Sequence, residues 1–465
     1  MKRLTIVLLA ALVSFSLFGQ DITGQWNGAL KVQGMQLRLV LHVTQTDDGY
    51  TATLDSPDQG ATGIPVTGIT FENPNIKFTV TNIGVEYNGE LQGDEIAGVF
   101  NQFGQEFPLN LSRQAIEKEV LKRPQEPTKP YPYYTEDVTF QNAEASISLS
   151  ATLTLPKTEG KYPVVILISG SGPQDRDEEI VGHKPFLVIA DYLTRNGIGV
   201  LRYDDRGFGQ STGDFSTATS ADFATDVESA IAYLKTRREV DKKKIGLVGH
   251  SEGGIIAPMV AAKSDDVSFI VLLAGTGIRG DKLLLLQQEL IARASHVPEF
   301  EILKAKLMNT KLYEMVIECN DTSKLRADLI SQMGEMLDNT ARGMIPNGIT
   351  KEDYISLQVK QIVSPWMLYF MKYDPAPTLE KVKCPVLAVN GEKDLQVPPK
   401  ENLTAIKNAL TKGGNMNVTA IEFPNLNHLF QECETGSPVE YSIIEQTFSP
   451  VALSEITKWI KTQTE

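Results

Sequence analysis

The feature that most constrains this chain is a serine held between glycines where an apolar run meets a helical segment. Residues 245–248 are apolar, the next six residues read Gly-His-Ser-Glu-Gly-Gly, and residues 254–262 have helical character. Glycines two positions before and after a serine permit a sharp strand-to-helix turn in which bulkier side chains would clash. The sequence therefore predicts that Ser251 lies on such a turn, with the N–H groups of the following helix directed at a developing oxyanion.

A serine hydroxyl is a poor nucleophile until an oriented base takes its proton. The chain has only five histidines, so elimination is informative. Four of them are unsuited by position: His42 lies in a β-rich segment, His296 in a helical insertion, His250 beside Ser251 but pointing away, and His183 on the way into a helix. The remaining one, His428, follows the strand-like residues 417–423, and we expect it to be the base.

The acid that orients the base is expected at Asp394, which follows the apolar run 386–389. Its place between Ser251 and His428 gives the chain order Ser, Asp, His. Two rivals stay open. Asp374 precedes Pro375 and closes the helical insertion, and Glu392 lies within a glycine turn.

The second oxyanion donor is expected in the loop after the apolar run 164–169, which reads Gly-Ser-Gly-Pro-Gln-Asp-Arg-Asp. Small residues let the backbone approach a substrate carbonyl. We expect the backbone amides of Glu252 and Ser171 to form the oxyanion hole, with Gly172 as a substitute for Ser171 and a plain glycine turn as the alternative. The segment lacks the register of a phosphate-binding loop.

Two further segments are expected to support the site. Asp204, Asp205 and Arg206 end a strand, and we interpret them as an ion-paired scaffold beneath the site rather than as substrate contacts. The aromatic stretch 365–371 is more typical of core packing in or against the helical insertion than of a substrate wall.

The organisation of the chain predicts two domains. Residues 21–113 alternate apolar and polar side chains in about eight short strands, which favours a small all-β barrel or sandwich, a packing or ligand-binding module. Residues 114–134 are Pro-rich and predict an extended linker. Residues 135–465 alternate strands and helices, which indicates an α/β domain with a mostly parallel sheet, helices on both faces and a helical cap at about 277–380.

The N-terminus predicts export. Lys2 and Arg3 precede an apolar run that ends near Phe18 in small and polar residues, the layout of a signal peptide over residues 1–20. The run is shorter than the ~20 residues of a membrane-spanning helix, the alternative reading. We expect a secreted or periplasmic protein with no stable membrane insertion after cleavage.

Composition excludes several partners. A net charge of −14, without a basic stripe, argues against nucleic acid. The three cysteines lie far apart, so at most one disulfide is expected and a cysteine-built zinc site is not. We expect no metal and no cofactor.

Taken together, the motifs at 249–253, 390–394, 427–428 and 204–211 resemble the α/β-hydrolase superfamily. With those at 170–177, 364–366 and 373–375, they are similar to secreted bacterial carboxylesterases in which a small β domain precedes a capped hydrolase. The resemblance implies cofactor-free hydrolysis of a small-molecule ester through an acyl-enzyme. A serine aminopeptidase or dipeptidyl peptidase, with Glu178 or Glu179 binding a substrate amine, stays open, as do a thioesterase or acyltransferase and association into a homo-oligomer.

Overall fold

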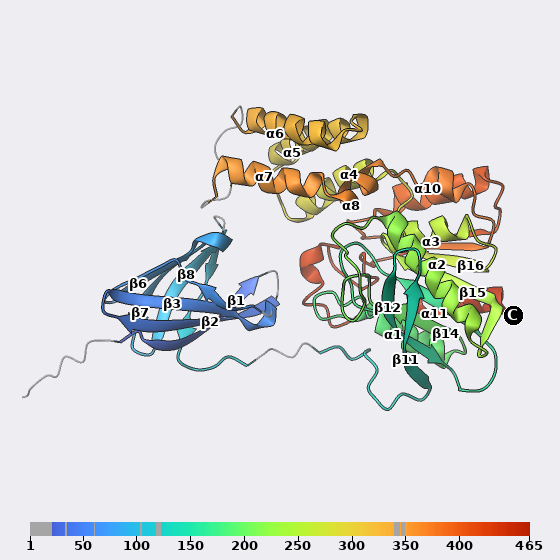
Figure 1. Cartoon of the computed structure of the whole chain (residues 1–465), viewed down its shortest axis with the longest axis horizontal. Coiled ribbons are helices and arrows are strands. Elements are labelled where there is room, and N and C mark those ends of the chain that lie inside the picture. The colour runs from blue at the N-terminus through green and yellow to red at the C-terminus, as the bar shows by residue number, and fades with distance from the viewer. Residues whose placement is uncertain are drawn as a thin grey trace, which may run out of the picture. The chain divides into compact units, whose positions relative to one another are not determined.

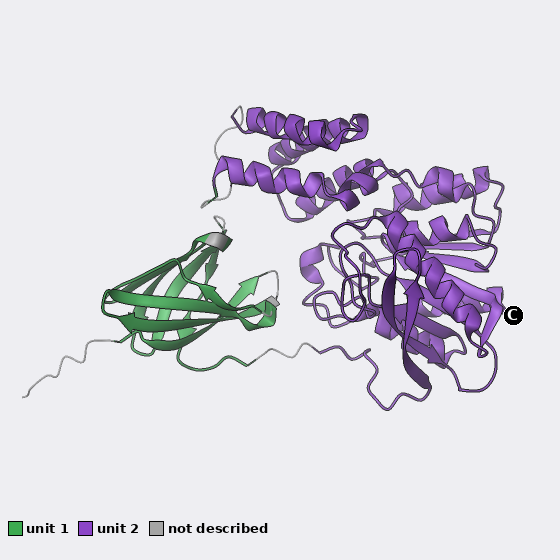
Figure 2. Cartoon of the chain, in the orientation of Figure 1, with its two compact units in different colours: residues 1–32, 36–119, 346–349 green, residues 33–35, 120–345, 350–465 purple. Residues whose placement is uncertain are grey.

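The computed structural model describes residues 21–32, 35–59, 61–102, 105–117, 122–338, 345 and 349–465. The predicted signal peptide, residues 1–20, lies outside the described residues. The chain divides into two compact units (Figure 2). The first, here the β unit, comprises residues 1–32, 36–119 and 346–349, and the rest forms the α/β unit.

The β unit is one antiparallel sheet in the order β4-β3-β2-β1-β10-β8-β7-β6-β5, with β9 paired to β8. Its strands are β1 (Gly24–Val32), β2 (Met35–Thr46), β3 (Gly49–Ser56), β4 (Ala61–Pro65), β5 (Gly68–Glu72), β6 (Asn75–Val80), β7 (Val85–Gln92), β8 (Glu95–Gln102), β9 (Gln105–Pro108) and β10 (Leu111–Ser112). Only two residues join the two edge strands β4 and β5, so the sheet is rolled into a half-barrel. The prediction of a small all-β domain is confirmed.

The α/β unit is built on an eight-stranded sheet in the order β11-β12-β14-β13-β15-β16-β17-β18 (Figure 1). Its strands are β11 (Tyr134–Asn142), β12 (Ile147–Leu155), β13 (Tyr162–Ile168), β14 (Gly199–Tyr203), β15 (Val240–His250), β16 (Phe269–Leu273), β17 (Val386–Gly391) and β18 (Val418–Phe423). The pairs from β14 to β18 are parallel, whereas β11 and β12 are antiparallel. The predicted mostly parallel sheet is confirmed, but its antiparallel start was not foreseen.

Helices cover both faces of this sheet, as its apolar pattern requires. Val165 and Leu167 of β13 pack into one core cluster, while Ile166 and Ile168 pack into the other, because successive side chains of a strand point to opposite faces. The first cluster is closed by α1 (Pro185–Arg195) and α11 (Pro450–Thr464), and the second by α2 (Ser220–Thr236), α3 (Gly253–Ala261) and α10 (Pro399–Lys412).

Between β16 and β17 the chain forms the helical cap that its periodicity predicts. The cap consists of α4 (Gly280–Ala294), α5 (Glu299–Glu318), α6 (Thr322–Asp338), α7 (Lys351–Ile362) and α8 (Pro365–Lys372), followed by the short α9 (Ala376–Leu379). Buried side chains such as Leu312, Val316, Leu329 and Val359 give it a core of its own. Within the described part of the chain, no helix is both long and apolar enough to cross a bilayer.

The second half of the predicted linker is fixed to the α/β unit. The guanidinium of Arg123 donates hydrogen bonds to the carbonyls of Ser442 and Ile444. The side chain of Gln125 bonds the backbone of Thr447 and Phe448. The side chains of Arg123 and Gln125 therefore attach this part of the predicted linker to the α/β unit.

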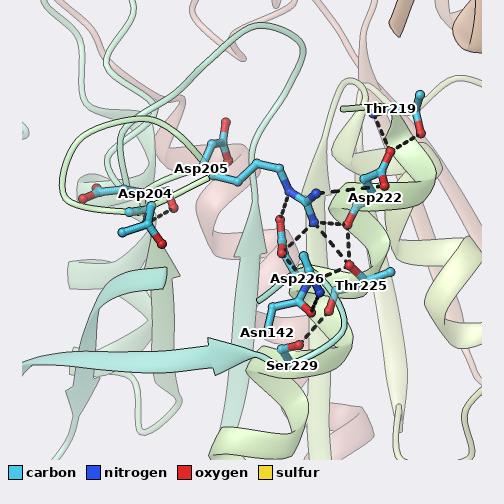
Figure 3. A network of polar contacts seen from close by, with 12 residues as sticks. Asn142, Asp204, Asp205, Thr219, Asp222, Thr225, Asp226 and Ser229 are labelled. Atoms are coloured by element: carbon cyan, nitrogen blue, oxygen red, sulfur yellow. Dashed lines mark hydrogen bonds and ion pairs between the residues drawn. The ribbon is translucent and has the colours of Figure 1, made fainter. Parts of the chain in front are cut away.

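A buried ion pair joins the loop after β14 to helix α2 and to the edge of the sheet. The guanidinium of Arg206 donates to both carboxylate oxygens of Asp226, over 2.7 and 2.9 Å. Asn142, at the end of β11, donates to Asp226 and to Thr225 over 2.7 Å each, as Figure 3 shows. Burial raises the pKa of Asp226 even with this partner, so the attraction does not fully offset the cost of removing the carboxylate from water. The ion pair therefore fixes the loop after β14 against helix α2 more than it adds to the free energy of unfolding.

Removing one member of this pair should be costly. Asp226→Ala leaves Arg206 buried without its counter-charge, and we expect the α/β unit to lose about 3–5 kcal/mol of unfolding free energy. The matched control is Lys235→Met on the same helix, because Lys235 pairs with Asp266 at a site where both side chains are more than one third exposed. Loss of that surface pair should cost less than about 1 kcal/mol. Urea unfolding followed by circular dichroism measures both, and equal losses would contradict the assignment.

Candidate active site

Ser251 lies on a strained turn between β15 and α3. Its φ of 53° is in the left-handed region, which non-glycine residues rarely adopt. Two hydrogen bonds hold the backbone of Ser251 in this conformation. Its amide donates to the carbonyl of Leu273, and its carbonyl accepts from the amide of Gly254. The structure thus places the predicted nucleophile at the carboxyl edge of the sheet, next to the start of a helix.

The two flanking glycines are required by close backbone contacts. A Cβ on Gly249 would lie 2.0 Å from the carbonyl oxygen of Gly253, and a Cβ on Gly253 would lie 2.2 Å from that of Ile168. No side chain fits at either position without moving backbone. The glycine pattern around Ser251 is therefore a steric requirement of this turn.

His428 and Asp394 meet in a buried hydrogen bond. Nδ1 of His428 lies 2.8 Å from Oδ2 of Asp394, and both side chains are almost fully buried. The other carboxylate oxygen, Oδ1, accepts from the backbone amides of Gln396 and Val397, over 2.8 Å each. With Nδ1 held by the carboxylate, Nε2 of His428 is the nitrogen left to accept a proton.

The two rivals for the acid are occupied elsewhere. The carboxylate of Asp374 accepts from the amide of Ala376 at the start of α9. Glu392 accepts from the amide of Asn425 and has no described bond to His428. Of the three candidates, the structure brings only Asp394 to His428.

A second histidine connects the Ser251 turn to the His428 loop. Among the described hydrogen bonds, none joins Ser251 to His428 directly. Instead His250 lies with its ring centroid 4.8 Å from that of His428, and its Nε2 is 3.1 Å from the carbonyl oxygen of His428. Its Nδ1 lies 2.8 Å from Oε1 of Glu178. Direct serine–histidine bonds are often long in unliganded hydrolases, so this does not exclude the pairing.

Glu178 holds both His250 and the 170–177 loop. The same Oε1 that faces His250 accepts from the amide of Gly170 over 2.7 Å. Burial by itself would lower the pKa of His250, but the charge and hydrogen bond of Glu178, with the carbonyl of His428, raise it above its ordinary value. Because Glu178 is 1% exposed and committed to these partners, it is not available to bind a substrate amine.

The 170–177 loop is held against the turn by two aspartates. A Cβ on Gly170 would lie only 3.2 Å from the Cβ of Ser251. Asp205 accepts from the Ser169 hydroxyl and the Gln174 amide, while Asp204 pairs with Arg176 over 2.7 Å. The expected scaffold exists, although its members bond to the loop and to α2 rather than to one another. Within the described residues, the amides of Ser171, Gly172 and Glu252 take part in no hydrogen bond.

The cap is fastened to the same turn through Glu252. Its buried carboxylate accepts from the Ser220 hydroxyl over 2.6 Å and from Nε1 of Trp366 over 2.8 Å. Trp366 belongs to α8 and stacks on Phe370 with ring centroids 5.1 Å apart. Burial raises the pKa of Glu252, partly countered by these two donors. The aromatic stretch of the cap therefore packs against the site rather than away from it.

Sequence reasoning missed the side-chain roles of His250, Glu178 and Glu252. Glu178 and His250 are 72 residues apart, and no local pattern links them. Glu252 did carry a signal, because a carboxylate at the first turn of an apolar helix needs donors once that helix is buried. The described residues contain no group of three or more His, Cys, Asp or Glu able to hold a metal ion, and all three cysteines are free thiols.

The Glu178–His250 pair predicts a pH-dependent contribution to stability. The folded-state pKa of His250 is raised above its unfolded value of about 6.5, so the contribution is complete below that pH and is lost as the pH rises through the folded pKa. Glu178→Gln should lower the unfolding midpoint most near pH 6, and the deficit should shrink towards pH 9. Glu179→Gln is the control, because the Glu179 side chain is 48% exposed and lies 3.7 Å from Lys184. A deficit that is constant with pH would contradict the pairing.

Parts of this chain are similar in sequence to known proteins. The family model described as "Serine aminopeptidase, S33" matches residues 184–345. Esterase EstD of Thermotoga maritima is 26% identical over 71% of this chain and 69% of its own length. An uncharacterized 31.7 kDa protein of Escherichia coli is 24% identical over 68% of this chain and 96% of its own length.

Among solved structures, the Pyrococcus furiosus esterase Pf2001 aligns with 71% of this chain and 93% of its own length, at 15% identity and a TM-score of 0.42. The sheet order of the α/β unit, the strained serine turn at the carboxyl edge and the sequence relatives lead to one assignment. The chain has the α/β-hydrolase fold, and its sequence relatives support a hydrolytic enzyme of the esterase-like kind.

Proposed function

We propose that this enzyme hydrolyses carboxylic esters, with Ser251 as nucleophile, His428 as general base and acid, and Asp394 as the residue that orients His428. The observation that carries the proposal is the buried 2.8 Å contact between His428 and Asp394, at the same edge of the sheet as the strained turn of Ser251. Buried His–Asp pairs beside a serine on such a turn are the working parts of serine hydrolases.

The reaction proceeds in two stages, acylation of Ser251 and hydrolysis of the acyl-enzyme. Oγ of Ser251 bonds to the ester carbonyl carbon while its proton passes to Nε2 of His428, and the C=O electron pair moves onto the oxygen. When the C=O bond re-forms, the ester C–O bond breaks and the leaving alkoxide takes the proton from His428. Water then repeats the two steps on the acyl-enzyme and releases the carboxylic acid, with Asp394 stabilising each imidazolium.

The backbone supports the oxyanion in this scheme. The amides of Ser171 and Glu252 are not engaged by other described groups, and the start of α3 adds positive partial charge near the turn. Gly172 is the alternative donor in the same loop. Preorganised donors of this kind contribute about 3–4 kcal/mol each where they have been measured.

An ester is favoured over a peptide substrate. The match to the serine aminopeptidase family keeps a peptidase as the second candidate. An aminopeptidase needs a carboxylate free to bind the substrate's amine. Glu178 is occupied by His250 and Gly170, and Glu179 lies 3.7 Å from the ammonium group of Lys184. Thioesterase and acyltransferase activities differ from the proposed one only in the leaving group or the acceptor.

The triad assignment is tested with a chromogenic panel. p-Nitrophenyl acyl esters of increasing length are compared with aminoacyl and dipeptidyl p-nitroanilides. We expect ester cleavage only, with Ser251→Ala and His428→Ala each reducing kcat by about 10⁴ to 10⁶ because the two act as a unit. Asp394→Asn should cost about 10⁴. Preferential anilide cleavage would move the enzyme to the peptidase class, and full activity of Ser251→Ala would overturn the mechanism.

The oxyanion assignment has a matched pair of variants at one position. Ser171→Pro removes the backbone N–H and should lower kcat for esters by about 10² to 10³. Ser171→Ala keeps that N–H and removes only an exposed hydroxyl, so its kcat should match the wild type. Equal activity of the two variants, with unchanged unfolding midpoints, would instead assign the oxyanion donor to the backbone amide of Gly172.

A further inference from the structure

The β unit is packed at one end of its half-barrel and hollow at the other. Along β2, Leu41 and Val43 are buried, whereas Leu37, which points to the same side, is half-exposed. Along β1, Trp26 is 1% exposed and Val32 is half-exposed. Side chains of one strand face should be equally buried in a filled barrel, so the gradient marks an interior that protein atoms do not fill.

This hollow end is a cavity of about 430 Å³, within the range of roughly 300–1,000 Å³ typical of small-molecule sites. Described residues of the β unit alone line it. Nine of them are apolar: Leu30, Val32, Leu37, Leu39, Leu54, Ile64, Ile83, Phe100 and Phe107. The other four are Ser56, Gln59, Gln102 and Gln105. An interior of this composition favours a ligand with an apolar body.

The polar lining residues are uncharged, and hydrogen bonds hold the side chains of Ser56, Gln59 and Gln102. The Ser56 hydroxyl donates to Oε1 of Gln59 over 2.7 Å. Nε2 of Gln102 donates to the carbonyl of Ile83 over 3.1 Å, and Gln102 lies opposite Gln105 in the register of β8 and β9. Amide and hydroxyl groups offer both donors and acceptors to a ligand.

Charge decides which ligand the cavity can take. The described ion pairs of the β unit, Arg38–Asp58 and His42–Asp55, use side chains that do not line the cavity. A charged ligand would therefore lose its hydration without gaining a counter-charge, at a cost of several kcal/mol. A neutral ligand meets no such penalty.

We propose that the β unit binds an uncharged small molecule with an alkyl or aryl body and one hydrogen-bonding end, in the cavity between β1, β2, β3, β4, β8 and β9. The lining residues belong to the β unit and Ser251 belongs to the α/β unit, so the proposal does not depend on the esterase mechanism proposed for Ser251.

The site is tested with the neutral fluorescent probe N-phenyl-1-naphthylamine, titrated into the full chain carrying Ser251→Ala so that no ester is consumed. We expect saturable binding. Ile64→Trp places a large side chain in the cavity from a half-exposed position on the edge strand β4. It should raise the Kd of the probe about tenfold or more, a change in binding free energy of about 1.4 kcal/mol or above. Val99→Trp adds the same side chain at a position that is 40% exposed and does not line the cavity, and should leave binding unchanged.

A second arm tests charge selectivity. Methyl octanoate should displace the probe, whereas octanoate, of the same length but charged, should displace it at least tenfold less well. This comparison tests charge selectivity, and Val32→Trp, at another half-exposed lining residue, tests the location of the probe if Ile64→Trp disturbs folding. Circular dichroism and hydrolysis of p-nitrophenyl acetate, with Ser251 restored, report whether each variant is intact.

The rival site for an apolar probe is the exposed face of cap helix α5, where Phe300, Leu303 and Leu307 are 50–74% exposed. Leu307→Glu places a charge on that apolar face and should not change the binding of the probe. Three outcomes would overturn the proposal: no saturable binding, equal binding in Ile64→Trp and Val99→Trp, or loss of binding in Leu307→Glu. Equal displacement by octanoate and its methyl ester would also overturn it.

Discussion

The site depends on one steric constraint, the closeness of backbone to backbone around Ser251. With Gly249 against the carbonyl of Gly253 and Gly253 against that of Ile168, β13, β15 and α3 meet with no side chain between them. The turn is therefore fixed by the sheet itself, and its positive φ is sustained by hydrogen bonds to Leu273 and Gly254 rather than by local preference. Everything else in the site is arranged around that fixed point.

Four of the acidic residues that are buried around this point are accommodated in two ways. Asp394 and Glu178 each face a histidine, and Asp394 also accepts two backbone amides. Asp205 and Glu252 have only neutral donors, and burial raises the pKa of both. Raised pKa values favour the protonated, uncharged form of these two, which limits the negative charge packed beneath the turn.

Much of the fold and of the candidate site could be predicted from the sequence, because the sequence patterns that indicate them are local. The turn at Ser251 is predicted by glycines two positions before and after the serine, and Asp394 and His428 each follow a recognisable apolar strand. The Glu178–His250 pair could not be predicted, since it joins loops that only the folded sheet brings together. The antiparallel strands β11 and β12 were missed because their start adjoins the Pro-rich segment, which reads as linker. Periodicity gave the inward face of the β strands, but the depth to which Leu37 and Val32 are buried depends on the curvature of the sheet.

The bond between Trp366 and Glu252 has a consequence for how this enzyme could be re-engineered. The side chain of Glu252 holds the cap, while its backbone amide is the proposed oxyanion donor, so one residue links the cap to the proposed reaction centre. Exchanging the cap helices for those of another hydrolase would widen or narrow the substrate range only together with a change in rate, unless a tryptophan donor at the position of Trp366 were kept.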